Sequence, residues 1–318
     1  MPQTATGGVG RVVHRVEPCC SPAGISPEHY TETPLAEDVA GLSDARTPVT
    51  GEALVNLVAK YLCCWMLPDA QDEPLPLEDV RRLLEMFHRH DSLNEPGDDI
   101  ELMHLMRRHG RELTPLADLP RMAHAVRCVV LAEDGPVHAG EDFVGLDMDA
   151  GTGILVLAQS IRARRAGCAH DEVWGIVRDR EAAARTYDLL AELGAGGAVT
   201  GDAASPESYR MLRGKTLCYV TNERLAGLPP QLGAQDFFRP YEALFRAAGP
   251  GAQAAGFFPE GLIVYCRRSN VSLILSRDNA FQCPPEYADV EFRPQGMVVE
   301  GAITPLHRLG EPFCRYLG

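Results

Sequence analysis

The sequence predicts an α/β protein with a doubly wound parallel sheet, a helical N-terminal cap and a small β-rich C-terminal portion. Three observations predict this fold class. Short apolar runs alternate with helical patterns between residues 138 and 250, the preceding region is helical in pattern, and short apolar runs follow residue 251. Parallel neighbouring strands need a crossover, and helices cover the sheet faces. A chain of 318 residues that is 45% hydrophobic can form two domains or one elaborated domain.

The N-terminal part divides into a tail and a helical region. Residues 1–45 mix Gly, Pro, Ser, Thr and acidic residues without periodicity, so we expect a disordered or loosely packed tail. Residues 46–137 place apolar side chains at three-and-four spacing, as at Val80, Leu83 and Phe87. Helix-breaking residues separate four predicted helices, GEALVNLVAKYLCCWML, PLEDVRRLLEMFHRH, DDIELMHLMRRHGREL and PLADLPRMAHAVRCVVLAE.

The predicted core spans residues 138–250 and the β-rich portion spans 251–318. In the core the strands EDFVGLD, VWGIVRD, GAVTGD and KTLCYVTNE are expected, with GILVLAQSIRARRAG, REAAARTYDLLAELG and QDFFRPYEALFRAAG as helices. After residue 251, GLIVYCRR and VSLILSRD flank a Ser-Asn turn, which is typical of an antiparallel pair.

Composition limits the partners. Acidic residues number 44 against 30 basic, a formal net charge of −14, which disfavours binding to nucleic acid or to an anionic membrane. No apolar window is long enough for a membrane span and the N-terminus has no signal-peptide core, so a cytoplasmic location is expected. The sequence does not predict an oligomeric state.

Cysteine and histidine spacing predicts no metal site. The ten cysteines are scattered without a CxxC pair, and several lie in apolar runs, where a thiol behaves as a small hydrophobic group. We therefore expect reduced core thiols. The histidines form no HExxH motif, and His104 and His109 are five residues apart, off the spacing that places two ligands on one helix face.

The most informative segment is VGLDMDAGTGIL, residues 144–155. A strand ends at Asp147, and Gly151 and Gly153 open the next helix, where backbone N–H groups can approach a ligand closely. The alternatives are a tight turn without a ligand and an acid that complements the helix dipole. The G-x-G-x-x-G spacing of dinucleotide-binding proteins is absent, and no GK[ST] of a phosphate loop follows the glycines.

This segment resembles the first motif of class I S-adenosylmethionine-dependent methyltransferases, a strand ending in an acid followed by Gly-x-Gly-x-Gly. Asp147, Gly151 and Gly153 match it, while Asp149 occupies the first glycine position. The resemblance implies a Rossmann-like methyltransferase fold, with S-adenosylmethionine as the cofactor held by Asp147, Asp149, Gly151 and Gly153. Asp149 would either crowd the pocket or add a second anion facing the cofactor's positive groups.

Two later positions extend the resemblance, which covers about residues 141–265. The family places an acid on the ribose at the end of the second strand, where this chain has Val177. Asp179, two residues on, is the candidate substitute. At the end of the third strand, Asp202 would accept a hydrogen bond from the adenine amino group. The alternative for Asp202 is a turn in which the carboxylate bonds its own backbone.

The fourth strand ends in Asn222 and Glu223, where family members keep residues that face the methyl acceptor. The resemblance here is weakly to protein arginine methyltransferases, whose acceptor loop has two glutamates, whereas this chain has Glu223 with Gln231 and Gln235 further on. Glu223 would orient or deprotonate the acceptor in an in-line displacement. Its alternative role is that of a solvated or helix-start acid.

The resemblance therefore predicts S-adenosylmethionine-dependent methyl transfer to a protein or small-molecule nucleophile. A different class of function stays open, a catalytically inactive methyltransferase-like protein that serves in binding or assembly. The departures at Asp149 and Val177 favour this second class. Cofactor binding distinguishes the two.

Overall fold

The computed structural model describes residues 25–70, 73–88, 100–133, 135–223, 234–248, 255–258, 265–266 and 299–300. Its centre is a five-stranded sheet in which every neighbouring pair is parallel, with strand order β3-β2-β1-β4-β5. The strands are β1 (Asp142–Asp147), β2 (His170–Val177), β3 (Gly197–Thr200), β4 (Tyr219–Thr221) and β5 (Gly256–Phe258). The prediction of an α/β protein with a parallel sheet is confirmed.

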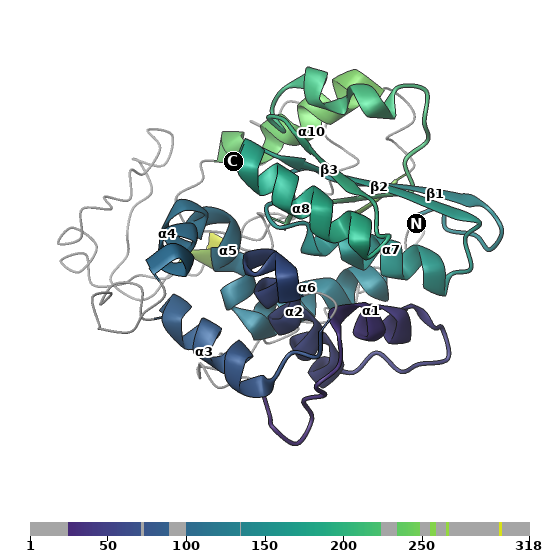
Figure 1. The fold of residues 1–318 in the computed structure, drawn as a ribbon. Coiled ribbons are helices and arrows are strands. Elements are labelled where there is room, and N and C mark those ends of the chain that lie inside the picture. Colours follow the sequence, from purple (N-terminus) through teal and green to yellow (C-terminus); the bar gives the residue numbers. More distant parts are fainter. Residues whose placement is uncertain are drawn as a thin grey trace, which may run out of the picture.

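Helices cover both faces of this sheet (Figure 1). On one face lie α7 (Ile154–Arg165) and α8 (Arg180–Glu192), and on the other lie α10 (Ala234–Ala248) and the 3₁₀ helix η3 (Pro206–Leu212). Side chains of β1 alternate between the two resulting cores: Phe143 packs in the first and Leu146 in the second. This alternation is what a strand buried on both faces requires.

The N-terminal helices form a further layer over α7 and α8 (Figure 1), and their apolar side chains belong to the same core. They are α2 (Gly51–Met66), the 3₁₀ helix η1 (Pro68–Ala70), α3 (Leu77–His88), α4 (Ile100–Arg108), α5 (Gly110–Ala117) and α6 (Leu119–Val130). The sequence predicted four helices here, and the structure differs by dividing the last two into three. The breaks fall at His109 and at Asp118, whose side chain accepts a hydrogen bond from the Arg121 N–H and so caps α6.

The predicted loose tail is wrong for α1 (Leu35–Ser43). Leu35, Val39 and Leu42 are buried against α2 and α7, at a spacing that places them on one helix face. Burying each such side chain contributes about 1.5–3 kcal/mol, which offsets part of the conformational entropy lost when this short helix is ordered. Asp38 adds an ion pair with the buried Lys60 of α2, at 2.6 Å between Oδ2 and Nζ.

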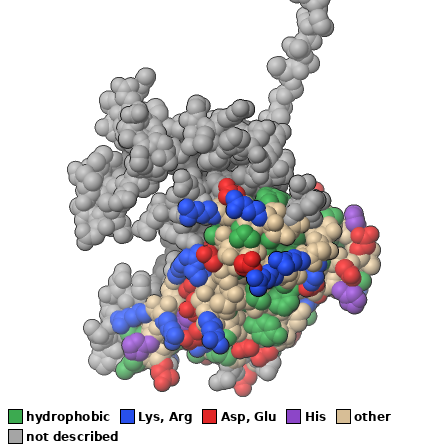
Figure 2. Space-filling model, turned by 90° about the horizontal axis from the view of Figure 1, so that it is seen from above, with side chains coloured by type: hydrophobic (Ala, Val, Ile, Leu, Met, Phe, Trp, Pro, Cys, Tyr) green, Lys and Arg blue, Asp and Glu red, His purple; other side chains and the backbone are tan. Residues whose placement is uncertain are grey.

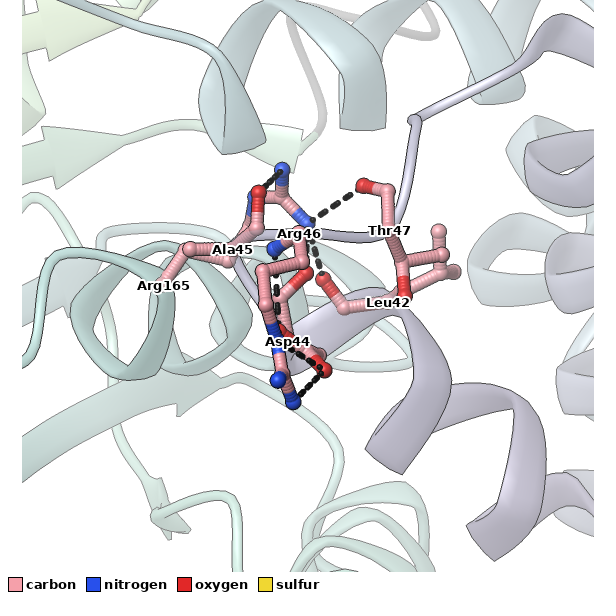
Figure 3. A network of polar contacts seen from close by, with 6 residues as sticks. All are labelled: Leu42, Asp44, Ala45, Arg46, Thr47 and Arg165. Carbon is pink, nitrogen blue, oxygen red and sulfur yellow. Dashed lines mark hydrogen bonds and ion pairs between the residues drawn. The ribbon is translucent and has the colours of Figure 1, made fainter.

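Arg165, in the last turn of α7, attaches the connection between α1 and α2 (Figure 3). One terminal nitrogen of its guanidinium, Nη1, donates to the backbone carbonyls of Leu42, Asp44 and Thr47 at 2.7–3.2 Å, and Nη2 donates to that of Ala45 at 3.3 Å. A guanidinium has five donors in a rigid fork, which suits a cluster of carbonyls. The basic end of α7 therefore serves to dock the N-terminal segment.

Of the predicted C-terminal β-rich portion, the described residues show β6 (Tyr265–Cys266) paired antiparallel with β7 (Val299–Glu300). The predicted turn between GLIVYCRR and VSLILSRD lies outside the described residues. In the described part of the chain, no disulfide forms among the free cysteines and no cluster of His, Cys, Asp or Glu could hold a metal ion. Within the same ranges, no helix is long and apolar enough to cross a bilayer.

Candidate functional site

The candidate site lies at the carboxyl ends of β1 and β4. Strands β2 and β3 lie on one side of β1, whereas β4 and β5 lie on the other, so the strand order reverses between β1 and β4. In open parallel sheets, ligands bind in the crevice at such a reversal. Asp147, the last residue of β1, pairs in register with Thr221 of β4. The topology therefore brings Asp147 and Glu223 together, although they are 76 positions apart in the sequence.

The loop from residue 148 to Gly153, here called the glycine loop, joins β1 to α7. Gly151 and Gly153 have φ angles of +49° and +83°, in the left-handed region that favours glycine. A β-carbon would also lie 2.9 Å from the Glu223 Oε1 atom at Gly151, and 2.6 Å from the Thr186 Cγ2 atom at Gly153. Both glycines are thus required by the backbone and by close neighbours from the protein itself.

The Glu223 carboxylate is buried against the glycine loop. Its Oε1 atom accepts hydrogen bonds from the Thr152 N–H at 3.2 Å and the Thr152 hydroxyl at 2.9 Å, and Oε2 accepts from the Gly153 N–H at 3.1 Å. The side chain therefore lies at the N-terminus of α7, where the helix dipole favours an anion. The sequence predicted that Glu223 faces a methyl acceptor, but in this structure its carboxylate is turned onto the loop.

Asp147 is fully buried beside Glu223. Its Oδ1 atom accepts hydrogen bonds from the Glu223 N–H at 3.1 Å and the Asp149 N–H at 3.4 Å, while Oδ2 has no hydrogen-bond partner among the described residues; the nearby Thr221 side chain acts to lower the pKa of Asp147. Burial raises the pKa of Asp147 to about 7. Burial, and then the charge of Asp147, also raise the pKa of Glu223 well above its usual value. The two carboxyls titrate as a pair that resists carrying two charges near neutral pH.

Asp149 and Asn222 lie beside this pair. Asp149 is half-buried in the turn after β1, where its N–H contributes one of the hydrogen bonds to Asp147. Asn222 is buried, and its N–H donates to the Phe258 carbonyl at 3.0 Å, which continues the pairing of β4 with β5. Both residues are therefore at the site, with backbone roles that help to fix the two strand ends.

At the end of β2 the structure buries Val177 in the core that α7 and α8 share with the N-terminal helices. Asp179 follows at a half-exposed position, and its side chain accepts a hydrogen bond from the Ala182 N–H at 2.8 Å, which caps α8. The buried His109 approaches the same carboxylate, at 3.8 Å between Nδ1 and Oδ1. Asp179 thus lies at the edge predicted for a ribose site, and its observed role is that of a helix cap.

At the end of β3, Asp202 forms a turn at the protein surface. Its Oδ1 atom accepts hydrogen bonds from the Ala204 N–H at 3.1 Å and from Arg178 at 3.3 Å. The first of these is the local backbone contact that the alternative interpretation of this residue predicted. The side chain is 55% exposed, so Asp202 lies in a different environment from the buried pair at β1 and β4.

Residues of α2 and α8 that were not among the predicted site residues also hold the glycine loop. The Tyr61 hydroxyl, from α2, donates to the Thr152 carbonyl at 2.6 Å. The Thr186 hydroxyl, from α8, donates to the Gly151 carbonyl at 3.2 Å and accepts a hydrogen bond from the Trp65 indole at 3.0 Å. The available signal is a tyrosine and a tryptophan within a mostly apolar helix, because a buried Tyr or Trp usually directs its polar group to a partner.

Comparisons with known proteins leave the family open: the chain matches no family model, and no curated protein or solved structure shows significant similarity to it.

Proposed function

We propose that this protein is an S-adenosylmethionine-dependent methyltransferase of Rossmann-like fold, with its cofactor at the carboxyl ends of β1 and β4. The observation that carries the proposal is the meeting of the glycine loop with two buried carboxyls, Asp147 and Glu223, where the strand order reverses. Ligands bind at this place in parallel sheets of this kind.

The buried Asp147 side chain supports a cationic ligand. The Asp147 Oδ2 atom is buried without a hydrogen-bond partner among the described residues, which is costly for a carboxylate and suits a positively charged or hydrogen-bond-donating group. S-adenosylmethionine supplies a methyl group on a positively charged sulfur together with an ammonium group. Either positive group would offset the burial that raises the pKa of Asp147.

Under this proposal, the residues of this chain align the reactants. Asp147 and the glycine loop would hold the cofactor, and Asn222 and Glu223 would face the acceptor. For Glu223 to take a proton from the acceptor, at least one of its oxygens must give up a hydrogen bond to Thr152 or Gly153. The expected catalytic cycle therefore includes a movement of the Glu223 side chain away from the loop.

A second function is favoured by one observation: the protein's own groups fill the space around the glycine loop. Glu223 takes the N–H groups of Thr152 and Gly153, and Thr186 packs where a side chain at Gly153 would lie. A catalytically inactive protein for binding or assembly would keep such a sealed loop as a structural element. Ligand binding separates the two functions.

Calorimetry with S-adenosylmethionine and S-adenosylhomocysteine provides this test. Heat of binding to the folded protein, lost in Asp147→Ala and retained in Asp188→Ala, supports the methyltransferase proposal, because Asp188 is exposed on α8. Absence of heat and of thermal stabilisation at millimolar ligand overturns the proposal and favours the inactive function. If the cofactor binds, Glu223→Gln should lower turnover by roughly 10²–10⁴-fold with little change in cofactor affinity.

The acceptor we propose is a protein or a small molecule. The formal net charge is −14, and Figure 2 shows positive and negative side chains interspersed over the described part of one face, without a broad region of positive charge. A methyl-transfer screen with radiolabelled cofactor on cell extract, divided into protein, nucleic-acid and small-molecule fractions, tests this proposal. Label found only in nucleic acid would contradict it.

A further inference from the structure

We propose that the N-terminal helices set the conformation of the glycine loop, with Tyr61 and Trp65 of α2 as positioning residues for ligand binding. The proposal rests on the function proposed above, since it assigns these helices a role in that site. It gives α2, which precedes the parallel sheet in sequence, a function besides packing.

The first contact is a buried hydrogen bond between distant parts of the chain. Tyr61 is fully buried, and its hydroxyl donates to the Thr152 carbonyl at 2.6 Å across 91 residues of sequence. The same hydroxyl lies 3.3 Å from the position of a β-carbon at Gly153. The tyrosine therefore holds the loop at Thr152, two residues before α7 begins.

The second contact is a relay through α8. An indole N–H can only donate and a carbonyl can only accept, so the Thr186 hydroxyl must accept from Trp65 and give its single proton to Gly151. Both hydrogen bonds are satisfied in only one orientation of the hydroxyl. Trp65 thereby fixes the direction in which Thr186 holds the Gly151 carbonyl.

These contacts determine where the loop amides point. The Gly151 carbonyl shares a peptide group with the Thr152 N–H, and the Thr152 carbonyl shares one with the Gly153 N–H. In a trans peptide group the C=O and N–H point in opposite directions. Holding both carbonyls toward α2 and α8 therefore directs both N–H groups to the opposite side, where Glu223 accepts from both and the Ala150 carbonyl shares the Gly153 N–H at 2.5 Å.

The consequence is a preorganised pair of donors at the candidate site. A loop whose N–H groups are oriented before binding loses less conformational entropy when a ligand, or the Glu223 carboxylate, accepts from them. If the Tyr61 contact is removed, the peptide group between Thr152 and Gly153 is held only at its N–H end, by the Ala150 carbonyl and Glu223, so the loop presents its donors for a smaller fraction of the time.

The test compares Tyr61→Phe with Tyr209→Phe. Tyr209 is an equally buried tyrosine in the core on the other face of the sheet, and its hydroxyl is shared between the Ala203 carbonyl at 2.6 Å and the Pro240 carbonyl at 3.1 Å. Both variants lose one buried hydroxyl. We expect Tyr61→Phe to speed hydrogen exchange at the Thr152 and Gly153 amides and to weaken S-adenosylmethionine binding, each by about tenfold, and Tyr209→Phe to change neither.

A purely structural role of Tyr61 would overturn the proposal, and it would appear as equal effects of the two variants on loop exchange and on affinity. If Tyr61→Phe does not fold, Thr186→Val provides the second variant, because it removes the relay hydroxyl while keeping the branched shape. If the wild-type protein binds no cofactor, the proposed function fails, while the exchange measurement still decides whether α2 holds the loop. Unchanged exchange in both Tyr61→Phe and Thr186→Val rejects the positioning role.

Discussion

The acids at the ends of β1 and β4 and those at the ends of β2 and β3 have opposite environments. Asp147 and Glu223 are buried, and the Glu223 N–H donates to Asp147. Asp179 and Asp202 are each about half exposed, and each accepts a hydrogen bond from a backbone N–H two or three residues ahead. All four follow or end a parallel strand on the same edge of the sheet.

This difference shows that the role of an acidic residue at a strand end depends on the structure that surrounds and follows that strand end. After β2 the chain turns directly into α8, so Asp179 serves to cap that helix. At the reversal between β1 and β4, by contrast, two strand ends meet and bury both acids in one place. Strand-end position alone therefore does not identify a ligand-binding acid.

The largest expected effect is on the pH dependence of stability, through Asp147. Its pKa is raised to about 7 in the folded protein, so the folded state holds a proton that the unfolded state releases near pH 4. Stability should fall as the pH rises from about 4 to 7, by at most about 4 kcal/mol. Asp147→Asn should reduce this loss and leave the part that comes from the raised pKa of the buried Glu223; the free energy of unfolding by urea at pH 5, 6, 7 and 8 measures it. The variant Asp188→Asn, at an exposed position, is the control. If the free energy of unfolding of Asp147→Asn falls with rising pH as steeply as that of the wild type, the effect of burying Asp147 is contradicted.

A smaller effect is expected for Glu223→Ala. This change leaves the buried Thr152 N–H without its acceptor, at a cost of about 1–3 kcal/mol, whereas the Gly153 N–H keeps its hydrogen bond to the Ala150 carbonyl. Urea unfolding at constant pH measures the loss, and Glu223→Gln, which keeps an acceptor oxygen, should recover part of it. Equal stability of Glu223→Ala and the wild type would show that the carboxylate does not hold the loop in solution.

Asp179→Ala tests the second region directly. Loss of the cap on α8 should cost about 1 kcal/mol, whereas Asp179→Asn should keep most of the stability because asparagine also caps helices. Thermal unfolding provides the comparison. A marked loss of S-adenosylmethionine affinity in Asp179→Asn, with stability unchanged, would give this acid the predicted ribose role and weaken the contrast between the two regions.

The smallest effect is expected for Asp202→Ala. The side chain is more than half exposed, so losing its contacts with Ala204 and Arg178 should change the free energy of unfolding by less than about 1 kcal/mol. Cofactor affinity should stay within about twofold of the wild type. A larger fall in affinity would support the predicted contact with adenine.

Patterns along the chain could predict much of the fold. The alternation of strands and helices from β1 to α10 is visible because each element shows its own period of apolar residues. The break at His109 between α4 and α5 was missed because the apolar spacing continues across it. Helix α1 was missed because nine residues give a weak signal, and its burial depends on docking to α2 and α7.

For the candidate site, the sequence by itself determined the glycine loop, the acid at the end of β1 and the polar pair after β4, because each is a local pattern of residue types. Only the tertiary structure decided that the Glu223 carboxylate accepts from the glycine loop, that Asp147 is buried beside it, and that Tyr61 holds the loop from the other side. The physical reason is that these contacts join residues 70–91 positions apart. Strand order and helix packing bring such residues together, and a local pattern does not specify either.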